Sequence, residues 1–240
     1  MSLGAIDLQV IAGALRAACE EMGATLVRSA HSANIKERRD CSTALFDPSG
    51  EMVMQAEHIP VHLGAMPAAV AAVLGEDHAA GHPWILNDPY RGGTHLPDIT
   101  VVTPVLHEQE LLGFAASRAH HADVGGRVPG SMPADSTMLD EEGVVIAPRV
   151  LDEDAIEELV ARMRQPEQRR ADLRAQLAAN RTGARRLAEL ADRLGRDALH
   201  EATAAVLDYA ERRTRASSTS IASRGPSGSA AMQARVRRSA

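Results

Sequence analysis

The sequence predicts an α+β protein, in which a mixed or antiparallel sheet of hairpins packs against helices and is followed by a C-terminal helical segment. Hydrophobic residues recur every three or four positions near the N-terminus and again after residue 152. Between these regions lie short β-branched runs separated by turns. We therefore expect an α+β part over residues 1–150, a helical segment over 151–216 and a tail over 217–240.

The first element is a helix from Ile6 to about Ser29. Its apolar positions fall on one face: Ile11, Leu15, Cys19, Met22 and Leu26. Because free cysteine is usually buried as a small hydrophobe, we expect Cys19 in the core and not at a site.

A first hairpin joins residues 43–47 to residues 51–55. The turn Asp47-Pro48-Ser49-Gly50 has proline second and glycine fourth, as a type I turn prefers. Asp40 and Cys41 precede this hairpin beside two arginines, which lower the pKa of a nearby thiol. Both are candidate substrate-binding residues, although no histidine adjoins Cys41 as its base, and a partly buried structural thiol is the alternative.

His58 and His62 follow, separated by a segment that Pro60 is expected to keep extended. Residues four apart on an extended chain point the same way, so both imidazoles can face one cleft. We hold them as candidates that either face a substrate or orient metal ligands through hydrogen bonds, with hydrogen-bonded loop or core histidines as the alternative. Residues 64–74 are rich in alanine and predict a short buried helix on the sheet.

A second hairpin joins residues 99–106 to residues 111–119 through a four-residue polar loop, and the strand 84–86 precedes it. With the turn centred between Glu108 and Gln109, Asp98 pairs with Ala119, and the residue before Asp98 pairs with His120. His95, Asp98 and His120 then lie at one end of two strands.

Two histidines and a carboxylate suit a divalent ion such as zinc, manganese or iron(II), with positions left for water or substrate. Eight of the ten histidines lie between His58 and His121, which favours a cluster over isolated polar residues. Asp88 is a candidate fourth ligand, or the acceptor of an Asx turn. Asp123, in a glycine-flanked loop, is the candidate general base, and His121 is an alternative base or a partner of the ligands.

After Gly126 a long loop runs to about residue 143, and residues 144–147 predict a closing strand. Apolar stripes over 156–163, 173–194 and 199–210 predict helices, the first ended by Pro166 and the second kinked or divided near residues 180–183. Their arginines alternate with acids and indicate solvated faces with ion pairs. From Ser217 the chain lacks acidic residues and predicts disorder.

Composition excludes several classes of protein. The formal charge is −6 and no basic stripe with interleaved aromatics occurs, so we expect no nucleic acid and no membrane as partner. Aromatic residues make up only 2%, against 45% hydrophobic residues, so the core is built from small aliphatic groups. No export signal or span of eighteen apolar residues is present, and two cysteines give no disulfide framework, so we expect a cytoplasmic protein.

Several motifs in order resemble the hydantoinase B/oxoprolinase family. They lie in residues 37–47, 58–66, 87–98 and 120–126, and the resemblance covers about residues 5–215. The family includes N-methylhydantoinase B subunits, the C-terminal part of oxoprolinase and the large subunit of acetone carboxylase.

The resemblance implies ATP-dependent opening of a cyclic amide, with hydantoin, N-methylhydantoin or 5-oxoproline as the type of substrate. It also implies a hydantoinase A-type partner subunit that binds ATP, and this chain has no GxxxxGK[ST] loop of its own. An acetone-carboxylase-like subunit and a non-catalytic fragment that only binds a partner are the alternatives. Family members are much longer, so we expect a truncated chain, with a frameshift or early stop near codon 216 as one explanation and an evolved basic tail as the other.

Overall fold

The computed structural model of the chain describes residues 4–57, 59–62, 64–78 and 81–223. A six-stranded antiparallel sheet forms its centre, in the order β2-β1-β5-β4-β3-β6. The strands are β1 (Cys41–Phe46), β2 (Met52–Glu57), β3 (Trp84–Leu86), β4 (Asp98–His107), β5 (Glu110–His120) and β6 (Arg149–Val150). Together with the packed helices, this sheet confirms the predicted fold class.

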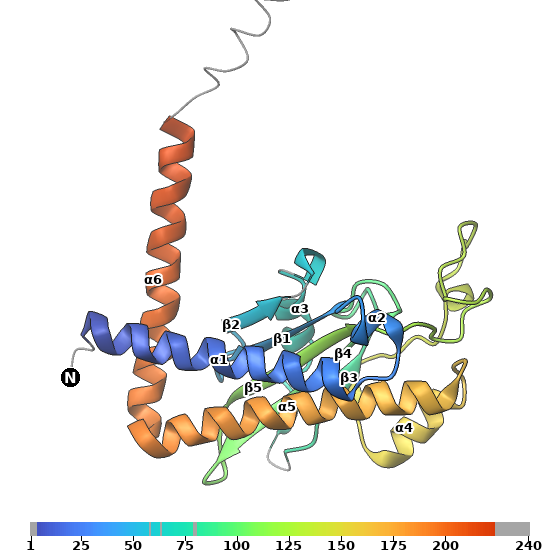
Figure 1. Cartoon of the computed structure of the whole chain (residues 1–240), viewed down its shortest axis with the longest axis horizontal. Coiled ribbons are helices and arrows are strands. Elements are labelled where there is room, and N and C mark those ends of the chain that lie inside the picture. The colour runs from blue at the N-terminus through green and yellow to red at the C-terminus, as the bar shows by residue number, and fades with distance from the viewer. Residues whose placement is uncertain (1–3, 58, 63, 79–80, 224–240) are drawn as a thin grey trace, which may run out of the picture.

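Helices cover both faces of the sheet (Figure 1). They are α1 (Ala5–Ser29), α2 (Ala33–Lys36), α3 (Met66–Ala71), α4 (Glu153–Val160), α5 (Pro166–Leu194) and α6 (Arg196–Ser223), with 3₁₀ turns η1 (Pro60–His62) and η2 (Leu139–Glu141). The long helices α1 and α5 lie side by side, and α6 extends away from the rest of the chain. None of the helices in the described part of the chain is long and apolar enough to cross a membrane.

The alternation of side chains along the strands builds a core on each face of the sheet. Leu45, Ala115 and Ala119 point to the α1 and α5 face, where the predicted α1 stripe, Cys19 included, is buried. The opposite face packs against α3, with Ala44, Phe46, Val102, Phe114 and Ala116 from the strands and Met66 and Val70 from the helix. Residues on both sides of position 150 contribute to the first core, so the change in secondary structure there is not a break in the packing.

The β4–β5 hairpin differs from the prediction by one residue. Glu108 and Gln109 both adopt left-handed backbone conformations and form a two-residue loop, not the expected four-residue one. Leu112 is an extra residue between the pairs Val105–Gly113 and Leu106–Leu111, which is a β-bulge. Beyond the bulge the register is shifted, so Asp98 lies opposite His120 instead of Ala119.

Two predictions of extended chain were wrong. The segment before His62 forms the 3₁₀ turn η1, because the fixed φ of Pro60 suits the first residue of a helical turn as well as a strand. Residues 144–147 form no strand, because their backbone hydrogen bonds do not form a ladder with one neighbouring strand. The N–H of Val144 donates to the carbonyl of Val124, whereas the carbonyl of Ile146 accepts from the N–H groups of Asn87 and Asp88. The short strand β6 follows them instead.

The helical segment also differs in its boundaries. Helix α4 ends at Val160, and Pro166 is the first residue of α5, where its missing N–H costs nothing. Helix α5 is continuous through residues 180–183. Gly183 lets α1 approach it there, since a Cβ at this position would overlap the side chain of Met22. Helix α6 runs to Ser223, so residues 217–223 of the expected disordered tail are helical, and 224–240 lie outside the described residues.

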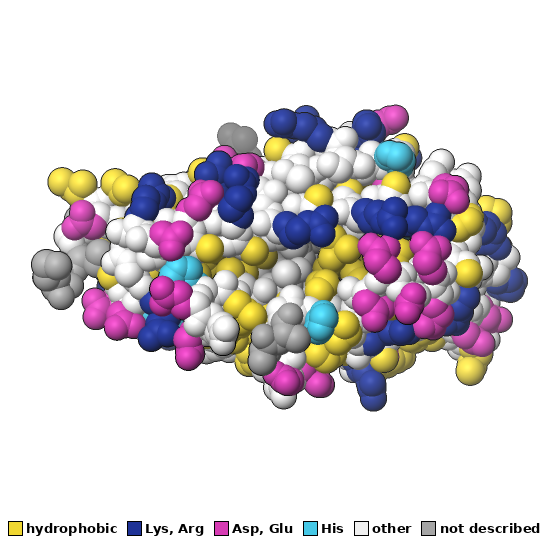
Figure 2. Space-filling view, turned by 90° about the horizontal axis from the view of Figure 1, so that it is seen from below, with side chains coloured by type: hydrophobic (Ala, Val, Ile, Leu, Met, Phe, Trp, Pro, Cys, Tyr) yellow, Lys and Arg dark blue, Asp and Glu magenta, His cyan; other side chains and the backbone are white. Residues whose placement is uncertain are grey.

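The exposed side of the helical segment carries alternating charges, which Figure 2 shows for the face seen from below. Arg170 pairs with Glu157 at 2.6 Å, and Arg186 pairs with Glu21 of α1 at 2.6 Å. These contacts confirm ion-paired, solvated faces for the helices.

Candidate metal centre

Three possible ligands converge at the end of the β4–β5 hairpin. Asp98 begins β4 and His120 ends β5, directly opposite it, while His95 belongs to the loop before β4. Nδ1 of His95 lies 3.2 Å from Oδ2 of Asp98, and Nδ1 of His120 lies 3.2 Å from Oδ1 of the same carboxylate. One ligand atom from each residue lies within 4.8 Å of the others. The sequence therefore predicted correctly which three residues meet.

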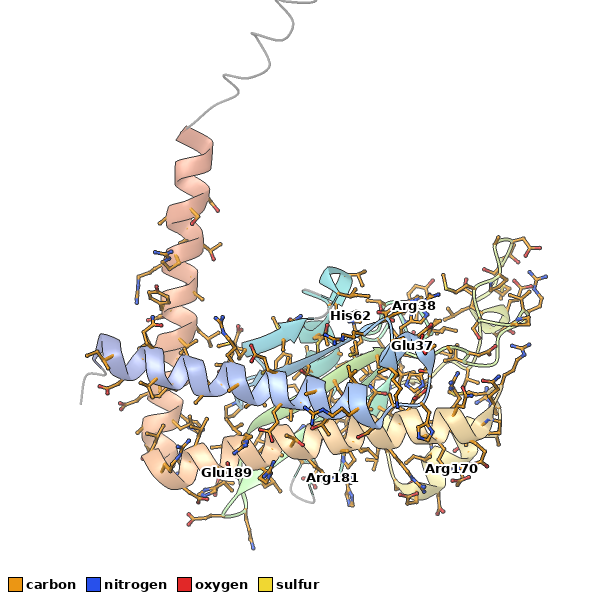
Figure 3. All side chains as sticks on the ribbon, viewed as in Figure 1. Glu37, Arg38, His62, Arg170, Arg181 and Glu189 are labelled. Atoms are coloured by element: carbon orange, nitrogen blue, oxygen red, sulfur yellow. The ribbon has the colours of Figure 1, made fainter. Side chains whose placement is uncertain are left out.

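Asp40 and His62 extend this cluster. Oδ2 of Asp40 lies 3.9 Å from Nδ1 of His120, because the residue before β1 runs beside the end of β5, and the N–H of His120 donates to the carbonyl of Asp40. Nε2 of His62 lies 3.4 Å from Oδ2 of Asp98 and 3.8 Å from Oδ1 of Asp40. Figure 3 shows His62 on the side of the sheet away from Arg181 and Glu189 of α5.

The side chains of the cluster differ in their exposure to solvent. The side chain of Asp98 is 3% exposed and that of His62 is 1% exposed, whereas His95 is 40% and Asp40 is 22% exposed. The buried carboxylate therefore lies at the bottom of the cluster, and His95 and Asp40 lie toward its opening.

The charge of Asp98 is stabilised despite its burial. Burial alone raises the pKa of this carboxyl, but its close contacts with the imidazoles of His120, His62 and His95 outweigh burial and hold the pKa well below its usual value. The same contact raises the pKa of His95 above its usual value. Asp98 is thus ionised at neutral pH, as a ligand of a divalent cation must be.

The loop that carries His95 is held by buried backbone contacts. The side-chain amide of Asn87 donates to the carbonyls of Leu96 and Val144 at 2.8 and 2.9 Å. Gly92 has φ +91°, and a Cβ there would lie 2.5 Å from the carbonyl oxygen of Ala68, so only glycine fits. The buried Arg118 of β5 donates to the carbonyl of Gly92 at 3.2 Å. These contacts position the loop before any ligand is present.

Asp88 does not belong to the group of ligands. Its Oδ1 accepts from the N–H of Tyr90 at 2.9 Å, and its carbonyl accepts from the N–H of Gly93. This is the Asx-turn alternative, in which Asp88 shapes the loop.

Asp123 is fully engaged as a hydrogen-bond acceptor in its own loop. Its oxygens accept from the N–H groups of Gly125 and Gly130, the hydroxyl of Ser131 and the guanidinium of Arg164. Burial raises the pKa of this carboxyl, but the backbone hydrogen bonds outweigh burial and the pKa is lowered. A carboxylate saturated in this way orders the loop after β5 and is a poor proton acceptor, so the structure does not support it as the general base.

His121 points away from the cluster, into the α5 side of the sheet. Its Nε2 lies 3.0 Å from Oε1 of Gln176, and the side chain is fully buried. Burial lowers the pKa of His121 to about 4, so the ring is neutral. His121 joins α5 to the sheet beneath the ligands and has no access to a substrate in this structure.

The candidate substrate-binding residues differ in how close they lie to the three ligands. Cys41 is buried, and burial raises its pKa to about 12 against the smaller lowering effect of Arg39, so its thiol is not activated. His62 approaches the ligands from η1, and His58 lies outside the described residues. Sequence reasoning gave Asp40 a substrate role and did not foresee its approach to His120. That approach follows from the pairing of Cys41 with Ala119 across β1 and β5, which no pattern in the sequence indicates.

The donor set fits a divalent cation. Two imidazole nitrogens and a carboxylate converge, and Oδ1 of Asp98 is buried without a hydrogen-bond partner, as expected of an atom reserved for a ligand bond. A second carboxylate, Asp40, lies at the opening.

Comparisons with known proteins agree with the motifs. A model of the family Hydantoinase B/oxoprolinase matches residues 4–237, which extends past Ser217. A 5-oxoprolinase from Dictyostelium discoideum is 41% identical over 207 residues, covering 82% of this chain and 16% of that protein.

A caprolactamase from Pseudomonas jessenii is similar in sequence and structure. Its beta subunit is 36% identical over 220 residues, or 88% of this chain and 38% of the subunit. The crystal structure of this ATP-dependent caprolactamase superposes with a TM-score of 0.84 at 35% identity, covering 90% of this chain and 39% of that one.

An acetone carboxylase in its nucleotide-free form has a TM-score of 0.75 at 22% identity, over 82% of this chain and 27% of that one, and so shares the fold. The chain spans between 16% and 39% of the length of these relatives.

Proposed function

Because the chain belongs to the hydantoinase B/oxoprolinase family, we propose that it is the metal-binding part of an ATP-dependent cyclic-amide hydrolase. The substrate class is a hydantoin, N-methylhydantoin or 5-oxoproline type of lactam or imide. The observation that carries the proposal is the convergence of His95 and His120 on the buried carboxylate of Asp98, in a chain whose relatives are named 5-oxoprolinase and caprolactamase.

The three converging residues would hold the cation, and Asp40 is placed to add a further oxygen at the opening. A bound zinc, manganese or iron(II) ion polarises a carbonyl oxygen or lowers the pKa of a water molecule. His95 lies on the solvent side, where a substrate would enter, and Asp98 stays ionised beneath it.

We also propose that ATP binds to a hydantoinase A-type partner subunit in the cytoplasm. One relative is named as a beta subunit, which supports a complex of unlike chains, and the sequence has no phosphate-binding GxxxxGK[ST] loop. Titration of the isolated chain with Mg-ATP in a calorimeter should therefore show no binding, and micromolar affinity would contradict this part of the proposal.

Elemental analysis tests the metal centre directly. Purified chain should retain close to one divalent ion, His95→Ala and His120→Ala should lose most of it, and Asp98→Asn should weaken binding. Binding should also weaken as the pH falls through the histidine range near ~6.5, since only neutral imidazole is a ligand. Because contact with Asp98 raises the pKa of His95, protons should begin to compete at a higher pH than for a free histidine.

His107→Ala is the matched control. His107 lies at the far end of β4, where its Nε2 contacts Asp192 at 2.8 Å on the surface, so its replacement should leave the metal content unchanged. Metal retained in both ligand variants, or lost equally in the control, would falsify the site.

A further inference from the structure

A buried serine of strand β1 contacts a buried histidine, and this histidine contacts the carboxylates of the candidate metal centre. Ser42 and His62 are each 1% exposed, and Oγ of Ser42 lies 3.0 Å from Nδ1 of His62. The other ring nitrogen, Nε2, lies between Oδ2 of Asp98 and Oδ1 of Asp40, at 3.4 and 3.8 Å.

The two carboxylates have the same orientation relative to the rings of His62 and His120. Each presents one oxygen to Nε2 of His62 and its other oxygen to Nδ1 of His120, at 3.2 Å for Asp98 and 3.9 Å for Asp40. Thr94 adds a hydrogen bond to Oδ2 of Asp98 at 3.1 Å, so this oxygen is held while Oδ1 has no hydrogen-bond partner. The arrangement restrains one oxygen and leaves the other for a cation.

The chemistry of the partners assigns the protons on the ring. Ionised carboxylates only accept hydrogen bonds, so Nε2 must carry a hydrogen to be stable between two of them. In the neutral ring Nδ1 is then an acceptor, and the hydroxyl of Ser42 donates to it. Nε2 makes no short, well-aligned hydrogen bond to either carboxylate alone. It lies between the two, where one N–H can be shared by both acceptors.

We propose that Ser42 and His62 are positioning residues for the metal centre: Ser42 fixes the tautomer and orientation of His62, whose Nε2–H holds Asp98 and Asp40 with one oxygen each toward the cation. This inference rests on the proposed metal centre and adds the residues that orient it. Groups that orient metal ligands through hydrogen bonds change metal affinity by about 10-fold to 100-fold when they are removed.

Two amide substitutions distinguish the role of Nε2 from the role of Nδ1. In His62→Gln the side-chain amide reaches the position of Nε2 and still donates toward the carboxylates, whereas in His62→Asn it reaches only the position of Nδ1, toward Ser42. If His62 merely filled space, both variants would behave alike. The inference predicts that the full chain with His62→Asn binds Co²⁺ at least about 10-fold more weakly than with His62→Gln.

Ser42→Ala tests the other end, with Ser117→Ala as its matched control. Ser117 is also a fully buried strand serine, but it lies on the opposite face of the sheet and its hydroxyl has no hydrogen-bond partner. Ser42→Ala should weaken Co²⁺ binding by about 10-fold or more and change the visible absorption of the bound ion, while Ser117→Ala should do neither.

Nitrogen-15 NMR of the metal-free chain gives a readout that needs no metal. The ring of His62 should show a protonated Nε2 and an unprotonated Nδ1, and Ser42→Ala should make the two tautomers more equal. A protonated Nδ1 in the wild-type chain, equal Co²⁺ affinities for His62→Gln and His62→Asn, or an unchanged affinity in Ser42→Ala each overturns the positioning role. A wild-type chain that binds no Co²⁺ overturns the metal centre itself, and the positioning role with it.

Discussion

Asn87→Asp should remove hydrogen bonds that hold the loop of His95, with little change in the shape of the side chain. The wild-type amide donates to the carbonyls of Leu96 and Val144, and its Oδ1 accepts from the N–H of Ile146 at 2.6 Å. In the variant an oxygen replaces the NH₂ group, so both carbonyls lose their donor and face a carboxylate oxygen inside the protein.

The magnitude follows from these contacts. A buried polar group that loses its partner costs about 1–3 kcal/mol, so two carbonyls cost about 2–6 kcal/mol. A domain of this size is stable by about 5–15 kcal/mol, so the loss should be large but need not prevent folding. Lower pH protonates the new carboxyl and returns one donor, so the deficit relative to wild type should shrink as the pH falls.

Urea unfolding and metal titration together form the assay. Asn180→Ala is the control, since Asn180 is equally buried and donates to the carbonyl of Val101 at 3.0 Å, but it lies on α5 and does not touch the loop. We expect both variants to lose stability and only Asn87→Asp to lose metal affinity. A loss below about 1 kcal/mol in Asn87→Asp, or equal metal affinities in the two variants, would refute the reasoning.

Three further outcomes are expected. Gly183→Ala gains about 1 kcal/mol of helix propensity but overpacks against Met22 at a cost of about 1–3 kcal/mol, so it should lower the urea midpoint in the wild-type chain and raise it in a Met22→Ala background. Asp123→Asn should lose stability at neutral pH, and the difference in melting temperature from wild type should begin to shrink as the pH falls below about 4 and vanish only below the lowered pKa of the folded carboxyl. The lowered pKa of Asp123 contributes stability only while the carboxyl is ionised, and protonation removes it. Asp172→Ala leaves the guanidinium of Arg169 buried without its carboxylate at 3.3 Å, and should cost about 3–5 kcal/mol in chemical unfolding, with a loss under 1 kcal/mol contradicting the pairing.

Local patterns in the sequence were sufficient for several elements. The stripe from Ile11 to Leu26 predicted α1 because burial of one helix face depends only on spacing. The turn at Asp47 formed as predicted, with the N–H of Gly50 donating to the carbonyl of Asp47 at 3.1 Å. The hairpin brought His95, Asp98 and His120 to one end of the sheet as predicted, but the bulge at Leu112, which puts Asp98 and His120 on the same face, was not predicted.

Contacts between distant segments were not within reach. The approach of Asp40 to His120 depends on β1 pairing with β5, and no periodicity states which strands pair. The amide of Gln176 on α5 donates to the carbonyl of Ile99 at 3.0 Å, yet in the sequence it looks like any polar residue on a helix. The surroundings of Asp123 were out of reach for the same reason, because its donors come from the fold of its own loop and from Arg164 in the connection between α4 and α5.

The extra residue at Leu112 has a consequence for how this hairpin tolerates mutation. A strand shifted by one residue turns every side chain to the other face, so the bulge decides that His120 and Asp98 emerge together on the α3 side. An insertion or deletion of one residue near the tip of the hairpin, some ten residues from the ligands, would therefore change which side chains face the α3 side at the far end. Point mutations at the tip carry no such risk, so substitutions should accumulate there over generations far more freely than insertions or deletions.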